Sequence, residues 1–190
     1  MALFRILLDV LPAPGALVSV PPEQAHHLVH VRRLRAGARI ECIDRNGRIA
    51  PARIVATTPT VTVQLIEQAV QTVAQFVLTL LPAVLPEKAF DVMLQKCTEL
   101  GVDECQPIIT ARTIVARASL TPARCARWQR ICDDAARQCG GPPMRVAAPL
   151  PFAQAMALDR QSRLIADRMG CRLHECLART AEDAAPLAAA

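Results

Sequence analysis

The amino-acid sequence predicts a two-domain protein of the α+β and α/β classes, with a β-rich module over residues 1–70 and an α/β domain over residues 74–190. Two observations lead to this fold class. Before residue 68, apolar runs of strand length alternate with turns. After residue 75, strand-length runs alternate with helical patterns, as in parallel α/β sheets. Residues 68–75 between them carry no charge, as expected of a linker.

The first module is expected to contain four strands and one helix. The apolar run 3–8 is typical of a strand, and Pro22 opens a helix that Ala36-Gly37 ends. Further strands are predicted over 39–44, 48–56 and 60–67, with Asn46-Gly47 as a hairpin turn signal.

The second domain begins with a predicted strand over 76–81 and an amphipathic helix from Phe90 that Gly101 ends. A buried strand follows over 105–110. Thr121-Pro122 is typical of a helix start, and this helix is expected to reach Cys139. The predicted elements after it are a strand over 145–148, a helix over 151–168, a strand over 171–175 and the first turns of a helix over 181–190.

Helical spacing predicts the buried faces of the two long helices. In the first helix the expected packed residues are Phe90, Met93, Leu94, Cys97 and Leu100. In the second they are Cys125, Trp128, Cys132, Ala135 and Cys139. Trp128, the only tryptophan, is therefore expected in the core, and stacking on a base is the alternative.

Composition excludes several classes of protein. The chain is 52% hydrophobic and 21% charged, with no run long enough to cross a membrane and no signal-peptide pattern, so a cytoplasmic protein is expected. Its eight cysteines form no C-x-x-C pair and are expected to serve as small hydrophobes. Cys171, His174 and Cys176 have the wrong spacing for a zinc finger, so no metal site is expected.

Positive charge is concentrated in one segment. The net charge is +5, and residues 32–53 hold seven arginines against two acids. This arginine cluster consists of Arg32, Arg33, Arg35, Arg39, Arg45, Arg48 and Arg53. The planar guanidinium offers phosphate two parallel hydrogen bonds, so the cluster predicts a surface that contacts nucleic-acid phosphates.

Three sequence blocks carry a family resemblance. They are His26-His27-Leu28 with residues 31–37; residues 85–88 and 95–102 with Pro107 and 110–113; and residues 127–131 with 135–140. In this order they resemble the ribosomal RNA uridine-N3 methyltransferases of the small subunit (type E), which belong to the SPOUT (trefoil-knot) superfamily.

The resemblance implies a PUA-like β-barrel that holds RNA, followed by a SPOUT-like methyltransferase domain. It also implies the reaction, in which a methyl group moves from S-adenosylmethionine to N3 of a uridine in 16S ribosomal RNA. The implied partners are ribosomal RNA, the small ribosomal subunit and a second copy of the chain, with no membrane.

Site residues follow from matching family positions. Arg112 and Lys96 are the expected catalytic residues, because a cation near the uracil carbonyls stabilises the deprotonated base. A surface ion pair between Lys96 and Glu99 is the alternative for that lysine. The expected RNA-binding residues are Arg32, Arg33, Arg35, Arg39, Arg45, Lys88 and His26. The expected substrate-cleft residues are Glu99, Thr113, Gln138, Cys139 and Gly140; for the last three, a simple helix end is the alternative.

The sequence also departs from the family pattern. Ala111 stands where relatives carry a glutamate, and Gly141 where they carry an arginine. The G-P-E-G-G and L-R-T-E-T-A segments, which form the knot and hold the cofactor in relatives, do not occur, so the cofactor-binding residues are unknown. The domain is therefore expected to be incomplete at its C-terminus, in a fragment or shortened form. The alternatives are a non-catalytic RNA-binding protein derived from the family, or another SPOUT RNA methyltransferase.

Overall fold

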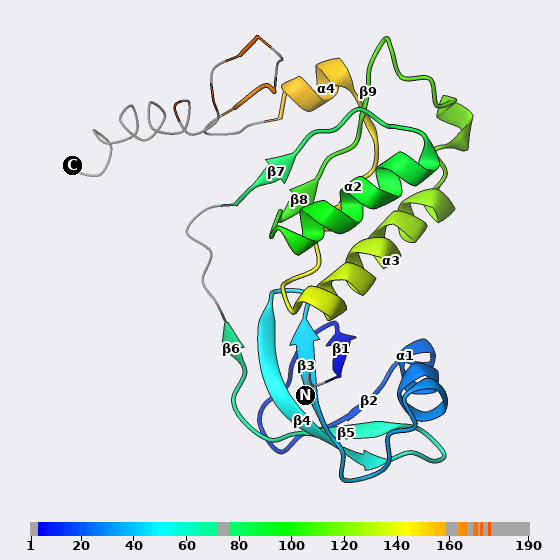
Figure 1. Ribbon diagram of the computed structural model, residues 1–190, viewed down its shortest axis with the longest axis vertical. Helices are drawn as coiled ribbons and strands as arrows, with labels where there is room; N and C mark the ends of the chain where they lie inside the picture. The colour runs from blue at the N-terminus through cyan, green and yellow to red at the C-terminus, as the bar shows by residue number, and fades with distance from the viewer. Residues whose placement is uncertain are drawn as a thin grey trace, which may run out of the picture. The chain divides into compact units, whose positions relative to one another are not determined.

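A computed structural model describes residues 4–71, 77–158, 163–166, 169–170, 172 and 175 (Figure 1). The chain divides into two compact units, Met1–Ala155 and Met156–Ala190. The first unit holds nearly all of the described secondary structure. The predicted helix over 181–190 and the cluster Cys171, His174 and Cys176 lie outside the described residues, as does the predicted strand over 171–175 apart from residues 172 and 175.

The N-terminal module is one curled sheet with the strand order β1-β3-β4-β5-β2, and β6 also pairs with β4 (Figure 1). The strands are β1 (Arg5–Leu8), β2 (Leu17–Ser19), β3 (Arg39–Asp44), β4 (Arg48–Ala56), β5 (Thr62–Leu65) and β6 (Val70–Gln71). Only β1 and β3 run parallel. β3 and β4 form the predicted hairpin, with Cys42 opposite Ala50 and a left-handed Gly47 (φ 76°) in its turn.

The predicted helix of this module is shorter than expected. α1 (Pro22–His26) passes into a π-helical turn (His27–Val31), and Arg33 then takes a left-handed conformation with φ 54°. The wider turn shifts the register of the side chains that follow. Leu28 is therefore fully buried, whereas Val31 is 57% exposed.

The second half of the first unit consists of short parallel strands and two long helices. β7 (Thr79–Leu80), β8 (Glu104–Cys105) and β10 (Arg145–Val146) form one parallel sheet, and β9 (Ile108–Ile109) pairs with β11 (Leu150–Pro151). α2 (Glu87–Glu99) and α3 (Pro122–Cys139) pack against each other beside these strands, and a 3₁₀ turn (Arg117–Ser119) precedes α3 (Figure 1).

Several predicted elements of this half are shorter than expected or are divided. The strands expected over 76–81 and 145–148 are only Thr79–Leu80 and Arg145–Val146. The single strand expected over 105–110 is divided into β8 and β9 by Gln106-Pro107, because proline cannot donate a ladder hydrogen bond. The helix expected over 151–168 is only α4 (Phe152–Met156), since residues 157–158 and 163–166 are not helical.

Each half has its own hydrophobic core. In the sheet, Ile6, Leu28, Ile40, Ile54 and Val63 are fully buried in one cluster. In the α/β half, Phe90, Leu94, Cys105, Trp128 and Met144 are fully buried in a second cluster. The rings of Phe90 and Trp128 contact each other with centroids 4.7 Å apart. Trp128 is thus a core residue, as predicted.

The predicted helix faces need two corrections. Leu100 is 83% exposed because α2 ends at Glu99, and Thr98 is buried instead, donating its hydroxyl to the Leu94 carbonyl at 2.8 Å. Cys139 is exposed at the end of α3, while Ala136 is buried in its place. Gly101 (φ 83°) follows α2 in the left-handed conformation that the sequence predicted.

Candidate functional site

The direction of the helices divides the candidate residues between two ends of the α/β half. α2 connects the parallel strands β7 and β8, and α3 leads into the parallel strand β10, so both helices run against the strands. The starts of α2 and α3 therefore lie at the carboxyl edge of the strands, together with the loop after β9. The ends of both helices lie at the amino edge.

Arg112, Thr113 and Lys88 lie at the carboxyl edge, where ligands gather in α/β sheets. The loop after β9 is a tight turn, in which the Thr113 hydroxyl accepts the Thr110 amide at 2.9 Å. Arg112 is exposed, and its guanidinium has no hydrogen bond or ion pair among the described residues. Lys88 is exposed in the first turn of α2. These cations are available to a ligand.

A cavity of about 560 Å³ lies at the same edge. Its lining consists of Ile109, Arg117, Leu120, Pro122, Cys125, Ala148, Pro149 and Pro151. Sequence reasoning missed Arg117, although it lies in the same loop as Arg112 and is the one charged residue in the lining. The cavity thus combines an apolar wall with a cation, which suits a planar polar base.

Lys96 and Glu99 lie at the opposite, amino edge and are occupied with each other. The Lys96 ammonium donates to Glu99 Oε2 at 2.7 Å, and the Gln95 amide donates to Oε1 at 2.8 Å. These hydrogen bonds lower the pKa of the Glu99 carboxyl. This is the ion pair that the sequence offered as the alternative to a catalytic lysine. Nothing in the described structure brings Lys96 to Arg112.

Gln138, Cys139 and Gly140 also lie at the amino edge, where α3 ends against the N-terminal sheet. The Gln138 carbonyl accepts a hydrogen bond from Arg5 Nη1 at 3.4 Å. Gly140 has φ 80°, and a Cβ atom there would come within 2.8 Å of Arg5 Cζ. Gln138 and Gly140 therefore contact Arg5 of the sheet, whereas the Cys139 thiol contacts the Ala136 carbonyl and the Gly141 amide of its own segment.

Two members of the arginine cluster have carboxylate partners. Arg45 donates to both oxygens of Asp133 at 3.1 Å and to Asp9 at 3.1 Å, and the Asp133 hydrogen bond raises the pKa of Arg45. Arg48 donates at 2.7 Å to Asp44, which is fully buried. Arg45 was predicted to bind RNA, but here its guanidinium is engaged within the chain.

The remaining cluster residues are exposed and have no carboxylate partner within the described part of the chain: Arg32, Arg33, Arg35, Arg39 and Arg53. Arg39 lies directly opposite Arg53 across the β3–β4 ladder, a pairing of like charges that costs free energy unless an anion compensates it. The Arg32 guanidinium lies 5.5 Å from the centroid of the Phe4 ring, which also stacks on His27. The rings of His26 and His30 lie 4.8 Å apart.

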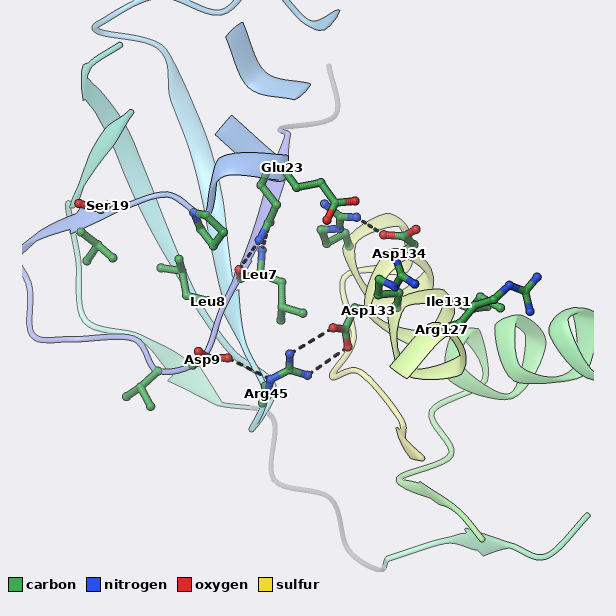
Figure 2. A pocket seen from close by; sticks show the side chains of 16 residues that line it. Leu7, Leu8, Asp9, Ser19, Glu23, Arg45, Arg127, Ile131, Asp133 and Asp134 are labelled. Atoms are coloured by element: carbon green, nitrogen blue, oxygen red, sulfur yellow. Dashed lines mark hydrogen bonds and ion pairs between the residues drawn. The ribbon is translucent and has the colours of Figure 1, made fainter. Parts of the chain in front are cut away.

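A groove of about 670 Å³ lies between β1 and α3 (Figure 2). Figure 2 shows Arg45 between Asp9 on one side and Asp133 on the other. The charged residues of its lining are Asp9, Glu23, Asp133 and Asp134, against Arg45, Arg127, Arg130 and Arg137. Because acids and arginines balance, this groove does not attract an RNA backbone.

The described residues do not by themselves fit S-adenosylmethionine. Its sulfonium and amino-acid groups need close backbone approach and an acidic or carbonyl lining. Within the described part of the unit Met1–Ala155, no glycine stands at the carboxyl edge, since its glycines lie in the sheet module or at the amino edge. The cavity there offers apolar walls and Arg117.

Two further features are absent from the described residues. No group of three or more histidine, cysteine, aspartate or glutamate side chains among them could hold a metal ion. Within the same residues, no helix is long and apolar enough to span a membrane.

Comparison with known proteins shows the family. The model of an RNA methyltransferase domain matches residues 73–188, and that of an RNA methyltransferase PUA domain matches residues 20–66. A curated relative, ribosomal RNA small subunit methyltransferase E of Synechocystis sp., is 34% identical over 143 residues. That alignment covers 73% of this chain and 45% of the relative, so the chain spans about half of the relative's length.

Solved structures show the same fold. A ribosomal RNA small subunit methyltransferase E from Neisseria gonorrhoeae, bound to S-adenosyl methionine, has a TM-score of 0.79 at 24% identity, covering 92% of this chain and 74% of that one. A protein of Legionella pneumophila, named as a methyltransferase in complex with the same cofactor, has a TM-score of 0.78 at 22% identity, covering 90% and 73%. The curled sheet is thus a PUA-like module followed by a methyltransferase domain, as predicted. This chain belongs to the RNA methyltransferase family that includes ribosomal RNA small subunit methyltransferase E.

Proposed function

We propose that this chain supplies the RNA-holding module and the substrate side of an S-adenosylmethionine-dependent methyltransferase that acts on N3 of a uridine in small-subunit ribosomal RNA. Residues 1–70 would hold the RNA and residues 74–190 would carry the methyltransferase part. The observation that carries the proposal is the methyltransferase family match over 73–188, joined to a PUA-like module whose exposed arginines lack carboxylate partners.

The residues at the carboxyl edge support a role in orienting the uracil base and in stabilising its deprotonated form. Methylation at N3 requires the N3 proton to leave, and the resulting negative charge spreads to the two neighbouring carbonyl oxygens. A fixed cation beside those oxygens stabilises this anion more than the neutral base. Arg112 is the proposed catalytic residue because its guanidinium is exposed and unpaired at this edge. Thr113 stabilises the turn that carries it, and Lys88 lies at the same edge, in the first turn of α2.

A second group of candidate substrate residues lies away from Arg112. Lys96, Glu99, Gln138, Cys139 and Gly140 match family positions but lie at the amino edge. A substrate role for them requires RNA to reach both edges.

The expected partners follow from the module that precedes the cleft. Arg32, Arg33, Arg35, Arg39 and His26 would contact phosphates. We expect small-subunit ribosomal RNA as the substrate, the cytoplasm as the compartment and a homodimer as the assembly, as in the family.

The test is to delete the gene that encodes this chain and to measure the modified nucleosides of the small-subunit RNA by mass spectrometry. The proposal predicts that 3-methyluridine is lost and that a plasmid copy of the gene restores it. Unchanged 3-methyluridine would contradict the proposal.

Two alternatives have their own outcomes in the same experiment. Loss of a different methylated nucleotide would indicate another SPOUT RNA methyltransferase. No loss, together with RNA binding by the purified chain, would indicate a non-catalytic RNA-binding protein. The observation that favours the second alternative is that the described residues offer no cradle for the cofactor.

A further inference from the structure

Three contacts within the unit Met1–Ala155 join the N-terminal sheet to the end of α3. The first is the fork of Arg45, whose two terminal nitrogens donate to the two oxygens of Asp133 while Nε donates to Asp9, each at 3.1 Å (Figure 2). The Asp133 side chain is 18% exposed and that of Arg45 44% exposed. A two-pronged pair at a partly buried position restricts orientation more than a single surface ion pair does.

The second contact is made by Arg5 from β1. Its Nε donates to Glu41 Oε2 at 2.6 Å, and its Nη1 reaches the Gln138 carbonyl at 3.4 Å. Glu41 thereby holds the guanidinium over the end of α3, where Gly140 leaves room for it. A side chain at position 140 would have to displace Arg5 and would also be strained at φ 80°.

The third contact is made by the turn of the β3–β4 hairpin. A Cβ atom on Gly47 would lie 3.1 Å from Cβ of Pro142, in the loop after α3. The hairpin tip therefore approaches that loop closely. All three contacts involve the stretch from Asp133 to Pro142, and none uses the carboxyl edge.

We propose that Arg45 and Arg5 are positioning residues: they set the PUA-like sheet at a defined orientation on α3. The family block Gln138-Cys139-Gly140 serves this joint rather than the substrate cleft. A consequence, which rests on the proposed function, is that RNA bound on the exposed arginines is presented to the methyltransferase part in one orientation. Arg45 therefore acts on catalysis through geometry and not by contacting phosphate.

Residual dipolar couplings of backbone amides in the ¹⁵N-labelled chain measure this orientation directly. In the unmodified chain, one alignment tensor is expected to fit the amides of β3–β5 and those of α2 and α3. In Arg45→Gln and in Asp133→Asn, two tensors of different magnitude or direction are expected, with chemical shifts in both cores preserved. Arg53→Gln is the matched control, since this exposed β4 arginine has no ion pair in the described structure, and one tensor should fit it.

The charge-swapped double variant Arg45→Asp with Asp133→Arg should again fit a single tensor. This result would show that the two tensors of the single variants arise from the lost ion pair and not from unfolding. A single tensor in Arg45→Gln would overturn the proposal. The proposal would also be overturned if the chemical shifts of Arg45→Gln changed throughout either core and the double variant did not restore them.

Salt dependence separates positioning from phosphate contact. The slope of log affinity against log salt, measured with a fragment of small-subunit RNA, should be the same for Arg45→Gln as for the unmodified chain. Alanine at Arg32, Arg33 and Arg35 together should reduce the slope by about 2. A reduced slope in Arg45→Gln would make Arg45 an RNA contact and overturn its positioning role. Absence of RNA binding by the unmodified chain would instead refute the proposed function and leave the orientation result standing.

Discussion

The arginines of the cluster differ in the groups that their guanidinium groups contact. Arg45 and Arg48 lie on acids, whereas Arg32, Arg33 and Arg35 have no carboxylate partner in the described structure. The sequence shows the charge density but not the pairing, because Asp133 is 88 residues away from Arg45 in the chain. An arginine that already has two acids gains little from phosphate, since it would have to give up existing charge-assisted hydrogen bonds.

Arg112 and Lys96 can be separated by their effect on methylation. With the gene supplied in trans to the deletion strain, Arg112→Ala is expected to lower 3-methyluridine in the small-subunit RNA by at least about tenfold, because a cation beside the developing anion is lost. Lys96→Ala is expected to change it less than about twofold, since its partner is Glu99. The larger loss in Lys96→Ala would contradict this assignment.

The buried thiols predict a fall in stability at alkaline pH. Burial raises the pKa of Cys42 and of Cys105 to about 12, and that of Cys132 to about 11, from an ordinary value of 9.0. Above pH 9 the unfolded chain loses these protons while the folded chain keeps them, so the free energy of unfolding falls as pH rises toward 11–12. The chain has no tyrosine and only two lysines, so apart from its cysteines few groups titrate in this range.

Urea unfolding at pH 8, 9 and 10 checks this expectation. Cys42→Ala should make the fall with pH shallower, by up to about 1.4 kcal/mol per pH unit. The exposed Cys139 provides the control, and Cys139→Ala should leave the slope unchanged. An equally steep fall in Cys42→Ala would show that its thiol is not the group responsible.

At the scale of elements, the strands and helices with strong local signals were predicted well. The bounds of β3 and β4 match the prediction residue for residue, because alternating burial and an Asn-Gly turn define a hairpin locally. The start of α3 was predicted by Thr121, whose hydroxyl accepts the Arg124 amide at 3.3 Å. The π-helical turn after α1 and the division of the 105–110 strand depend on tertiary packing and were not predictable.

α3 is the element on which the methyltransferase core depends most. Trp128 is fully buried against Phe90, so Trp128→Ala is expected to lower the free energy of unfolding by about 3–5 kcal/mol through lost burial and a cavity. Arg130→Ala, on the exposed face of the same helix, should change it by less than about 0.5 kcal/mol. Urea unfolding followed by circular dichroism measures both. Equal effects of the two variants would contradict the assignment of Trp128 to the core.

At the scale of the whole molecule, the two cores and the family could be predicted, but the arrangement of the candidate site could not. Sequence blocks place Arg112 and Lys96 in one family signature, 16 residues apart by their numbers. In the structure one follows a strand and the other ends a helix that runs against the strands, so they lie at opposite edges. The direction of a helix relative to its sheet follows from strand pairing, which is a long-range property.

We propose that RNA held by the exposed arginines of the PUA-like module is methylated at N3 by the domain that follows. N3-methylation blocks Watson–Crick pairing, so primer extension along the small-subunit RNA stops at the modified uridine. In the deletion strain, the gene with its natural sequence should restore the stop. The gene with Arg32, Arg33 and Arg35 all replaced by alanine should restore it to less than about a tenth. Full restoration by that triple variant, at equal protein abundance, would contradict the account.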